Sequence, residues 1–238
     1  MCNMLDFHLH LARLPHAERL SKALKELDYS YIGIACEPWE WEKASALKPE
    51  KISFGIHPMV ATQVSIKDFE DLEKYIAQNE SAGVGECGID KRFPGYEEGG
   101  IQEQVFKRQV ALATKYGRDL QIHCVGDYSR VVKWLKESNY PPKDSGTSPR
   151  PVFHRFGGDE GIVRAALPLG AIFSLHEDSF RKKSTAKALA QIPEANTRFE
   201  TDADETTFHT EDVEEMASSL AARLIAVQDA LKKLREKL

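Results

Sequence analysis

One aspartate and two histidines alternate with apolar residues near the start of the chain, in the run Leu5-Asp6-Phe7-His8-Leu9-His10-Leu11. Alternate residues of a β-strand share a face. Asp6, His8 and His10 are therefore predicted on one face of a strand, with the four apolar residues on the other. Imidazoles two residues apart on a strand can bind one metal ion such as zinc. The pattern alone leaves open a second interpretation, two half-buried histidines bonded to backbone groups.

Four more ligand-type residues stand at the carboxyl ends of short apolar runs: Glu86, His123, His154 and Asp202. A single polar residue in such a place is usually a hydrogen-bonded end residue. Together with His8 and His10, the four supply mixed nitrogen and oxygen coordination, which suits zinc or manganese. Six ligands exceed what one open catalytic zinc takes. They suffice for two ions bridged by Glu86, an arrangement that recurs in the hydrolysis of phosphate esters.

Eight short β-rich runs alternate with amphipathic or charged stretches, which predicts βα units around a parallel sheet. The runs lie at residues 4–10, 31–36, 52–57, 82–87, 119–124, 151–155, 171–175 and 197–202. Helices are expected at 16–27, 67–79, 102–116, 127–138, 180–191 and 211–236. Eight such units in 238 residues predict an α/β fold, a (β/α)8 TIM-type barrel forming one domain over residues 1–238. The six candidate ligands would then converge at the carboxyl ends of the strands.

Two connecting segments are distinctive in composition. Residues 140–150, rich in proline, glycine and serine, lead from a helix into a strand and are expected on the face opposite the catalytic one. Residues 91–100 contain Phe93-Pro94-Gly95-Tyr96 and follow a strand. This second segment is therefore expected over the catalytic face, as a substrate loop.

The net charge of −5 and the pI near 5.9 exclude general electrostatic attraction to a phosphate backbone. A polyanion would have to be bound locally, through a few phosphates. The four cysteines show neither CxxC spacing nor the density of a disulfide scaffold, which indicates a cytoplasmic protein. The chain contains no signal-peptide pattern and no apolar run of the roughly 20 residues that span a bilayer, so no membrane association is expected. No obligate protein partner is evident.

A set of short motifs resembles the TatD family of metal-dependent hydrolases, within the amidohydrolase-like barrels. In chain order they are Asp6-x-His8-x-His10, Gly55-Ile56-His57-Pro58, Gly85-Glu86-Cys87-Gly88-Ile89-Asp90, His123, His154-x-Phe156 and Glu200-Thr201-Asp202. The resemblance covers almost the whole chain. It implies a (β/α)8 barrel, two divalent ions (zinc, manganese or magnesium) and phosphodiester hydrolysis, commonly of DNA as a 3′–5′ exonuclease or DNase. It also implies metal ligation by the six residues named above and substrate contact by His57.

Four positions depart from the family pattern, and none of them is a candidate metal ligand: Lys91, Val125, Gly157 and Asp204. These departures leave the natural substrate open. Arg92, and with it Arg155, is a candidate for the phosphate contacts that the changed positions lose. Pro58 cannot donate to a sheet ladder, so it should end the third strand and leave His57 at the catalytic face.

The chemistry expected is metal-assisted hydrolysis, with Asp202 both a ligand and the acceptor of the attacking water's proton. Asp6 is expected behind the ligands, orienting a histidine through its second ring nitrogen. The substrate expected is a DNA end or a small phosphodiester. Two alternatives are an amidohydrolase acting on C–N or carboxylic-ester bonds, whose pocket would lack phosphate-binding cations, and a non-catalytic barrel that keeps a metal and binds a partner.

Overall fold

The computed structural model describes residues 4–142 and 148–237. Its eight parallel strands follow one another around the sheet in chain order, and each pairs with the next. They are β1 (Met4–Leu9), β2 (Tyr29–Ala35), β3 (Lys51–Phe54), β4 (Gly83–Asp90), β5 (Leu120–Val125), β6 (Pro151–Phe153), β7 (Ile172–Leu175) and β8 (Thr197–Phe199). The predicted (β/α)8 barrel is confirmed.

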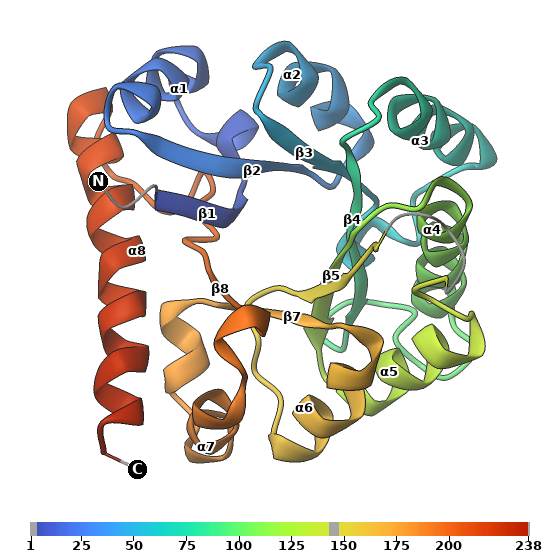
Figure 1. The fold of residues 1–238 in the computed structure, drawn as a ribbon. Coiled ribbons are helices and arrows are strands. Elements are labelled where there is room, and N and C mark those ends of the chain that lie inside the picture. The colour runs from blue at the N-terminus through green and yellow to red at the C-terminus, as the bar shows by residue number, and fades with distance from the viewer. Residues whose placement is uncertain (1–3, 143–147, 238) are drawn as a thin grey trace.

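The helices form a ring outside the strands (Figure 1). They are α1 (Ala17–Glu26), α2 (Trp41–Ala46), α3 (Ile66–Gln78), α4 (Ile101–Tyr116), α5 (Tyr128–Glu137), α6 (Glu160–Ala166), α7 (Lys183–Gln191) and α8 (Val213–Arg235). Short 3-10 turns follow several strands, among them η1 (Leu11–Arg13), η2 (Pro38–Glu40), η3 (Pro58–Val60) and η5 (Glu177–Phe180). Of the main helices, α2 and α6 were not among the ranges expected from the sequence.

Backbone hydrogen bonds join the first strand to the segment after the last. The amide of His10 donates to the carbonyl of Ala203, and the amide of Asp202 donates to the carbonyl of His8, both at 3.0 Å. These bonds bring the two ends of the sheet together. The ligand-type residues of β1 therefore face Asp202, although they are almost 200 residues away in the sequence.

Three strands end two or three residues earlier than expected, and the difference falls on residues of interest. β3 ends at Phe54, β6 at Phe153 and β8 at Phe199. His57, His154 and Asp202 thus lie in irregular segments just beyond their strands. β4 is instead longer than expected, because Cys87–Asp90 continues to pair with β5.

The last helix packs on the barrel, as its apolar spacing predicts. Its buried Met216, Leu220 and Leu224 belong to one core cluster with Leu20 and Leu24 of α1. Figure 1 shows α8 running along one side of the barrel beside α1 and α7. Lysines and an arginine occupy its last turn, where cations interact favourably with the negative end of the helix dipole.

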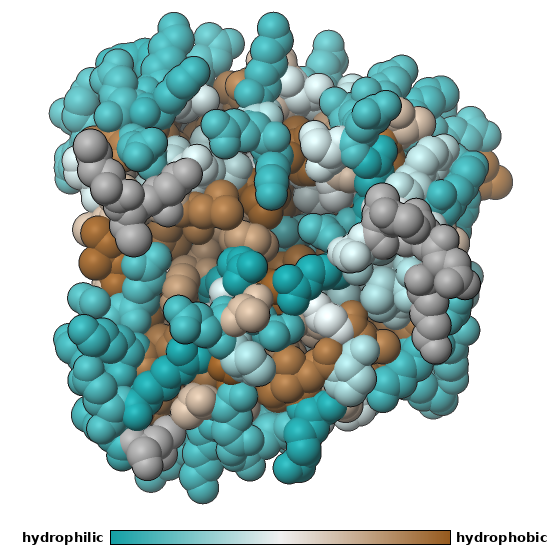
Figure 2. Space-filling model, viewed as in Figure 1, coloured by the Kyte–Doolittle hydropathy of each residue, from teal (hydrophilic) through white to brown (hydrophobic). Residues whose placement is uncertain are grey.

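The two distinctive segments lie at opposite ends of the barrel. The described parts of residues 140–150 connect α5 to the start of β6, as expected, whereas residues 143–147 lie outside the described part. Residues 91–100 connect the carboxyl end of β4 to α4. On the face shown in Figure 2, hydrophilic side chains cover the outer helices and hydrophobic ones lie toward the centre. Within the described ranges, no helix has the length and apolar character needed to cross a membrane.

Candidate metal centre

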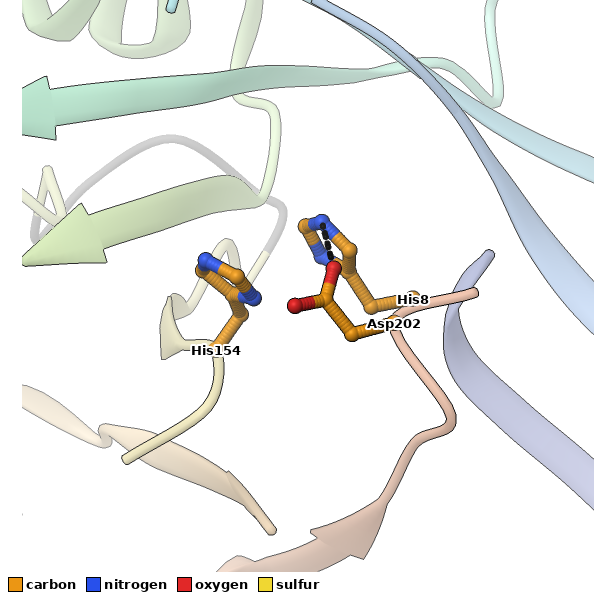
Figure 3. Close-up of side chains that lie close together, drawn as sticks. All are labelled: His8, His154 and Asp202. Atoms are coloured by element: carbon orange, nitrogen blue, oxygen red, sulfur yellow. Dashed lines mark ion pairs between the residues drawn. The ribbon is translucent and has the colours of Figure 1, made fainter. Parts of the chain in front are cut away.

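The two histidines of the β1 motif point toward the same pair of carboxylates. The Nε2 atoms of His8 and His10 lie 3.3 and 3.4 Å from Oε2 of Glu86. The same two atoms lie 3.8 and 3.5 Å from Oδ1 of Asp202. All four side chains are at least 90% buried. Figure 3 shows Asp202 facing His8. The ring of His154 is stacked on that of His8, with the ring centroids 4.0 Å apart.

The glycines on either side of Glu86 allow β4 to approach β5 closely. Gly85 and Gly88 have φ values of +118° and +151°. A Cβ atom would lie 2.3 Å from the carbonyl oxygen of Gln121 at Gly85, and 1.8 Å from that of His123 at Gly88. Only glycine fits both positions. The glycines of this motif therefore let the backbone place the Glu86 carboxylate inside the barrel.

The second oxygen of Glu86 faces a different group of imidazoles. Its Oε1 lies 2.6 Å from Nδ1 of His123, 2.8 Å from Nε2 of His154 and 3.5 Å from Nε2 of His57. The ring nitrogens of His123 and His154 are 3.1 Å apart. Glu86 thus stands between two sets of donors, one for each of its oxygens.

The spacing of these donors fits divalent ions. Ligand atoms of a tetrahedral sphere with bonds of about 2.1 Å lie roughly 3.4 Å apart. The separations of 3.3 to 3.8 Å among His8, His10, Glu86 and Asp202 match that value. The six predicted ligands are therefore brought together, and their arrangement suits a metal centre.

Charge interactions within the cluster are strong. Burial raises the pKa of the Glu86 carboxyl, but the neighbouring imidazoles of His154, His57 and His8 outweigh it and hold that pKa well below its usual range. The pKa of Asp202 is also lowered, because the hydrogen bond from His10 and the charges of nearby histidines outweigh burial. Both carboxylates are therefore ionised at neutral pH, as metal ligands must be.

Two carboxylates for which the sequence alone indicated no role stand behind the histidines. Oδ2 of Asp90 lies 3.0 Å from Nε2 of His123, and Oε1 of Glu200 lies 3.3 Å from Nδ1 of His154. Carboxylates in this position fix the orientation of a ligating imidazole and raise its basicity. The sequence could have indicated this role, because Asp90 and Glu200 occur in the same motifs as Glu86 and Asp202.

Asp6 makes a different contact from the one expected. Its carboxylate accepts hydrogen bonds from the backbone amides of His8 and Thr201 at 3.1 and 3.0 Å, and from the hydroxyls of Tyr29 and Thr201 at 2.7 and 2.5 Å. Strand alternation brings Asp6 to the inner face, but deeper in the barrel than the histidine rings. Asp6 therefore orients the backbones of β1 and the segment after β8, and no contact with a ring nitrogen is present among the described residues.

Replacing Asp6 by alanine should lower the free energy of unfolding by about 3 kcal/mol, because several buried donors would lose their acceptor. Burial raises the pKa of this carboxyl to about 7 despite those four hydrogen bonds. Chemical denaturation of Asp6→Ala measures the loss. Tyr29→Phe, which removes one donor only, should cost about 1 kcal/mol. Equal stability of Asp6→Ala and the unchanged protein would contradict this role.

His57 lies beside the cluster with one ring nitrogen already used. Its Nδ1 accepts the amide hydrogen of Met59 at 3.1 Å, so the ring proton of the neutral form is on Nε2. Burial and the charge of His123 lower the pKa of His57 to about 3. Pro58 begins η3 immediately afterwards, but it does not end the third strand as expected, because β3 already ends at Phe54. His57 is thus a neutral imidazole whose N–H faces the cluster.

A cavity of about 660 Å³ opens beside His123 and His154. Its lining includes five basic residues: Lys91, Arg92, Arg155, Arg181 and Lys182. Arg92, the predicted phosphate contact, donates three side-chain hydrogen bonds to Asp90, and its side chain is 61% exposed. Phe93 of the predicted substrate loop approaches His57 edge-on at 6.3 Å. The segment 91–100 therefore borders both the cluster and the cavity.

A further buried group adjoins the cluster on the side of β2. Ligand atoms of His10, Cys36 and Glu40 lie within 4.8 Å of one another. Glu40 is paired with Arg13, and Cys36 accepts a hydrogen bond from Arg13 at 3.6 Å. Burial, together with the charge of Glu86, raises the pKa of the Cys36 thiol to about 12. Cys36 lies four residues before Glu40, and this spacing does not form a metal-binding motif that could be recognised in the sequence.

Similarity to known proteins extends along most of the chain. Residues 5–234 match the family described as TatD related DNase. The 3′-5′ ssDNA/RNA exonuclease TatD of Edwardsiella piscicida is 28% identical over 152 residues, which cover 63% of this chain and 56% of that protein. The Uncharacterized metal-dependent hydrolase TatD of Mycobacterium tuberculosis is 28% identical over 160 residues, covering 65% and 58%. The matched region thus spans little more than half the length of these relatives.

Solved structures agree in fold. The crystal structure of YJJV, a TatD homolog from Escherichia coli K12, superposes with a TM-score of 0.73 at 20% identity, covering 99% of this chain and 96% of that one. The family match includes every strand end that carries a candidate ligand. The motifs, the barrel and the match over residues 5–234 agree: the chain belongs to the TatD-related DNase family.

Proposed function

We propose that this protein is a divalent-metal-dependent hydrolase of phosphodiester bonds that acts on the 3′ ends of nucleic acid strands. The observation that carries the proposal is the arrangement around Glu86, whose two oxygens face two separate sets of imidazoles. His8, His10 and Asp202 would hold one ion, His123 and His154 the other, and Glu86 both. Two bound divalent ions supply Lewis acidity and a water of lowered pKa.

The protein's own side chains would divide the remaining work. Asp202 accepts the proton of the attacking water, as an ionised carboxylate at the edge of the cluster. His57 donates its Nε2 hydrogen to a phosphoryl oxygen, since its Nδ1 is already bonded to the backbone. Asp90 and Glu200 keep the rings of His123 and His154 in position.

The cavity favours this proposal over the two alternatives. An amidohydrolase of small neutral substrates would need no cations in its pocket, whereas five basic residues line this one. A metal used only for structure would be closed off by its ligands, whereas His123 and His154 border an open cavity. Both features suit a phosphodiester substrate that reaches the cluster.

Removal of metal should abolish hydrolysis, and manganese, zinc or magnesium should restore it, because the expected nucleophile and Lewis acid are both lost with the ions. The measurement is an activity screen on chelated and reconstituted protein. It compares single-stranded DNA, RNA, a chromogenic phosphodiester and a dihydropyrimidine. Activity on the dihydropyrimidine alone would replace the proposal by an amidohydrolase, and metal-independent hydrolysis would contradict the centre.

Binding of single-stranded DNA should depend only moderately on salt. The net charge is −5, and the cavity beside the centre is lined by five basic residues, so a strand end bound there meets only a few cations. A log–log slope shallower than about −4 is expected, corresponding to fewer than about six phosphates. Titrations of metal-loaded Asp202→Asn at several salt concentrations measure it. A steeper slope would indicate an extended basic track.

A further inference from the structure

Arg155 joins the ends of three strands beside the candidate centre. It directly follows His154, and its Nη1 donates to Oδ2 of Asp202 at 2.7 Å. Its Nη2 forms a short ion pair with Asp178, which lies in η5 just after β7. The guanidinium is thus in contact with the carboxylate that we propose as proton acceptor.

The backbone of Arg155 is held in an unusual conformation. Its φ is +43°, in the left-handed region that residues other than glycine seldom adopt. The amide of Arg155 donates to Oε1 of Glu200 at 2.5 Å, which stabilises this conformation. Asp202, its partner, is also left-handed, with a φ of +50°. Such conformations are concentrated at active sites and ligand-binding segments.

Asp178 gives Arg155 an attachment that does not depend on Asp202. Its other oxygen, Oδ1, pairs with Arg181 at 2.7 Å. Its backbone amide donates to Nδ1 of His176 at 3.1 Å, which fixes the turn after β7. Arg155 can therefore keep its position when another anion takes the place of the Asp202 contact.

The contact with Asp202 is compatible with the proposed centre. Arg155 uses Oδ2 of Asp202, whereas His8 and His10 face Oδ1. One oxygen is thus directed to the cluster and the other to the guanidinium. This arrangement puts a permanent cation at the boundary between the cluster and the cavity.

The cavity lies on the open side of Arg155, whose side chain is 45% exposed. Its volume of about 660 Å³ is in the usual range for small-molecule pockets. Two of the acidic residues in its lining, Asp127 and Asp159, cap helices α5 and α6. The basic residues of the lining include Lys91 and Lys182, for which no ion pair is present within the described ranges. The cavity thus has more cationic than anionic groups available to a ligand.

We propose that Arg155 is a substrate-binding residue, whose guanidinium contacts a non-bridging oxygen of the phosphate at the end of the strand, and that the cavity holds the terminal nucleotide. This proposal rests on the phosphodiesterase function and names the subsite for its substrate. Asp178 is the positioning residue that holds the guanidinium. Arg92 is less suited to this contact, because its guanidinium already donates three hydrogen bonds to Asp90.

The test compares Arg155→Ala, Arg155→Lys and, as a control, Arg164→Ala on the exposed side of α6. The substrate is a short single-stranded DNA, and metal content is measured for each metal-loaded protein. Arg155→Ala should raise KM about 10- to 100-fold at full metal content, as expected for loss of a charge-assisted hydrogen bond. Added guanidinium should restore part of that loss. Arg155→Lys should have a smaller rise in KM than Arg155→Ala, because lysine keeps the positive charge although it lacks the planar guanidinium that can donate two parallel hydrogen bonds. Arg164→Ala should have the KM of the unchanged protein.

A second measurement does not depend on turnover. Titration calorimetry with deoxyadenosine 5′-monophosphate should show binding to the metal-loaded protein and about 10-fold or greater weakening in Arg155→Ala. No binding to the unchanged protein, or equal binding to both, would overturn the subsite. Loss of metal from Arg155→Ala would overturn it as well, since Arg155 would then act only through Asp202. Nucleotide binding that depends on Arg155, with no phosphodiester hydrolysed, would overturn the proposed function and leave the subsite supported.

Discussion

Glu86→Ala is expected to lose both bound metal and hydrolytic activity, with kcat/KM falling at least about 10³-fold. The reason is that Glu86 directs one carboxylate oxygen to each set of imidazoles. Its Oε2 faces His8 and His10, and its Oε1 faces His123 and His154. Without this carboxylate, the rings of His123 and His154 lose the anion between them, and the rings of His8 and His10 keep Asp202 but lose the link to the other set.

Metal content by elemental analysis and activity on single-stranded DNA measure the effect together. Glu42→Ala, an exposed change on α2, is the matched control and should keep both. Glu86→Gln keeps the shape and one carbonyl oxygen, so it should retain more metal than the alanine variant. Full metal stoichiometry in Glu86→Ala would remove this residue from the centre.

Asp202→Asn is expected to lower kcat by about 10²–10⁴-fold, with little change in KM. The amide keeps the side-chain shape and one coordinating oxygen but cannot accept the proton. Because Arg155 donates to Oδ2 of Asp202, the amide oxygen is expected to face Arg155 in part of the molecules. Metal content must therefore be measured in the same preparation.

His57→Ala separates binding from chemistry in the same assay. If its Nε2 donates to the phosphate in the ground state, KM should rise more than kcat falls. Near-normal turnover in Asp202→Asn with metal present would exclude this residue as the proton acceptor. A large loss of kcat in His57→Ala would instead indicate a contact made chiefly in the transition state.

The residues of the centre could be predicted from the sequence, because in a barrel the periodicity of a strand and the place where it ends determine where a side chain lies. Alternation in β1 puts His8 and His10 on one face. The carboxyl ends of parallel strands meet at one end of the barrel, so Glu86, His123, His154 and Asp202 were expected to converge. The structure brings these side chains together around Glu86.

What surrounds the candidate ligands depends on distances between strand ends that no local pattern contains. Asp6 has the spacing of a residue that orients a histidine, yet its depth in the barrel directs it to backbone amides and hydroxyls. Glu200 and Asp90 contact the rings instead, because the short β6 and the extended β4 bring them level with His154 and His123.

The roles of the two candidate arginines also could not be predicted from local sequence. Arg92 and Arg155 each follow a strand end, and their sequences do not distinguish them. In the folded chain Arg92 pairs with Asp90, two residues away, whereas Arg155 reaches carboxylates 23 and 47 residues distant. The sequence by itself determined the strand order, the faces and the residue types of the centre, since these follow from periodicity and the parallel fold. Only the tertiary structure decided which charged groups pair across the barrel, because those contacts depend on where each strand leaves the sheet.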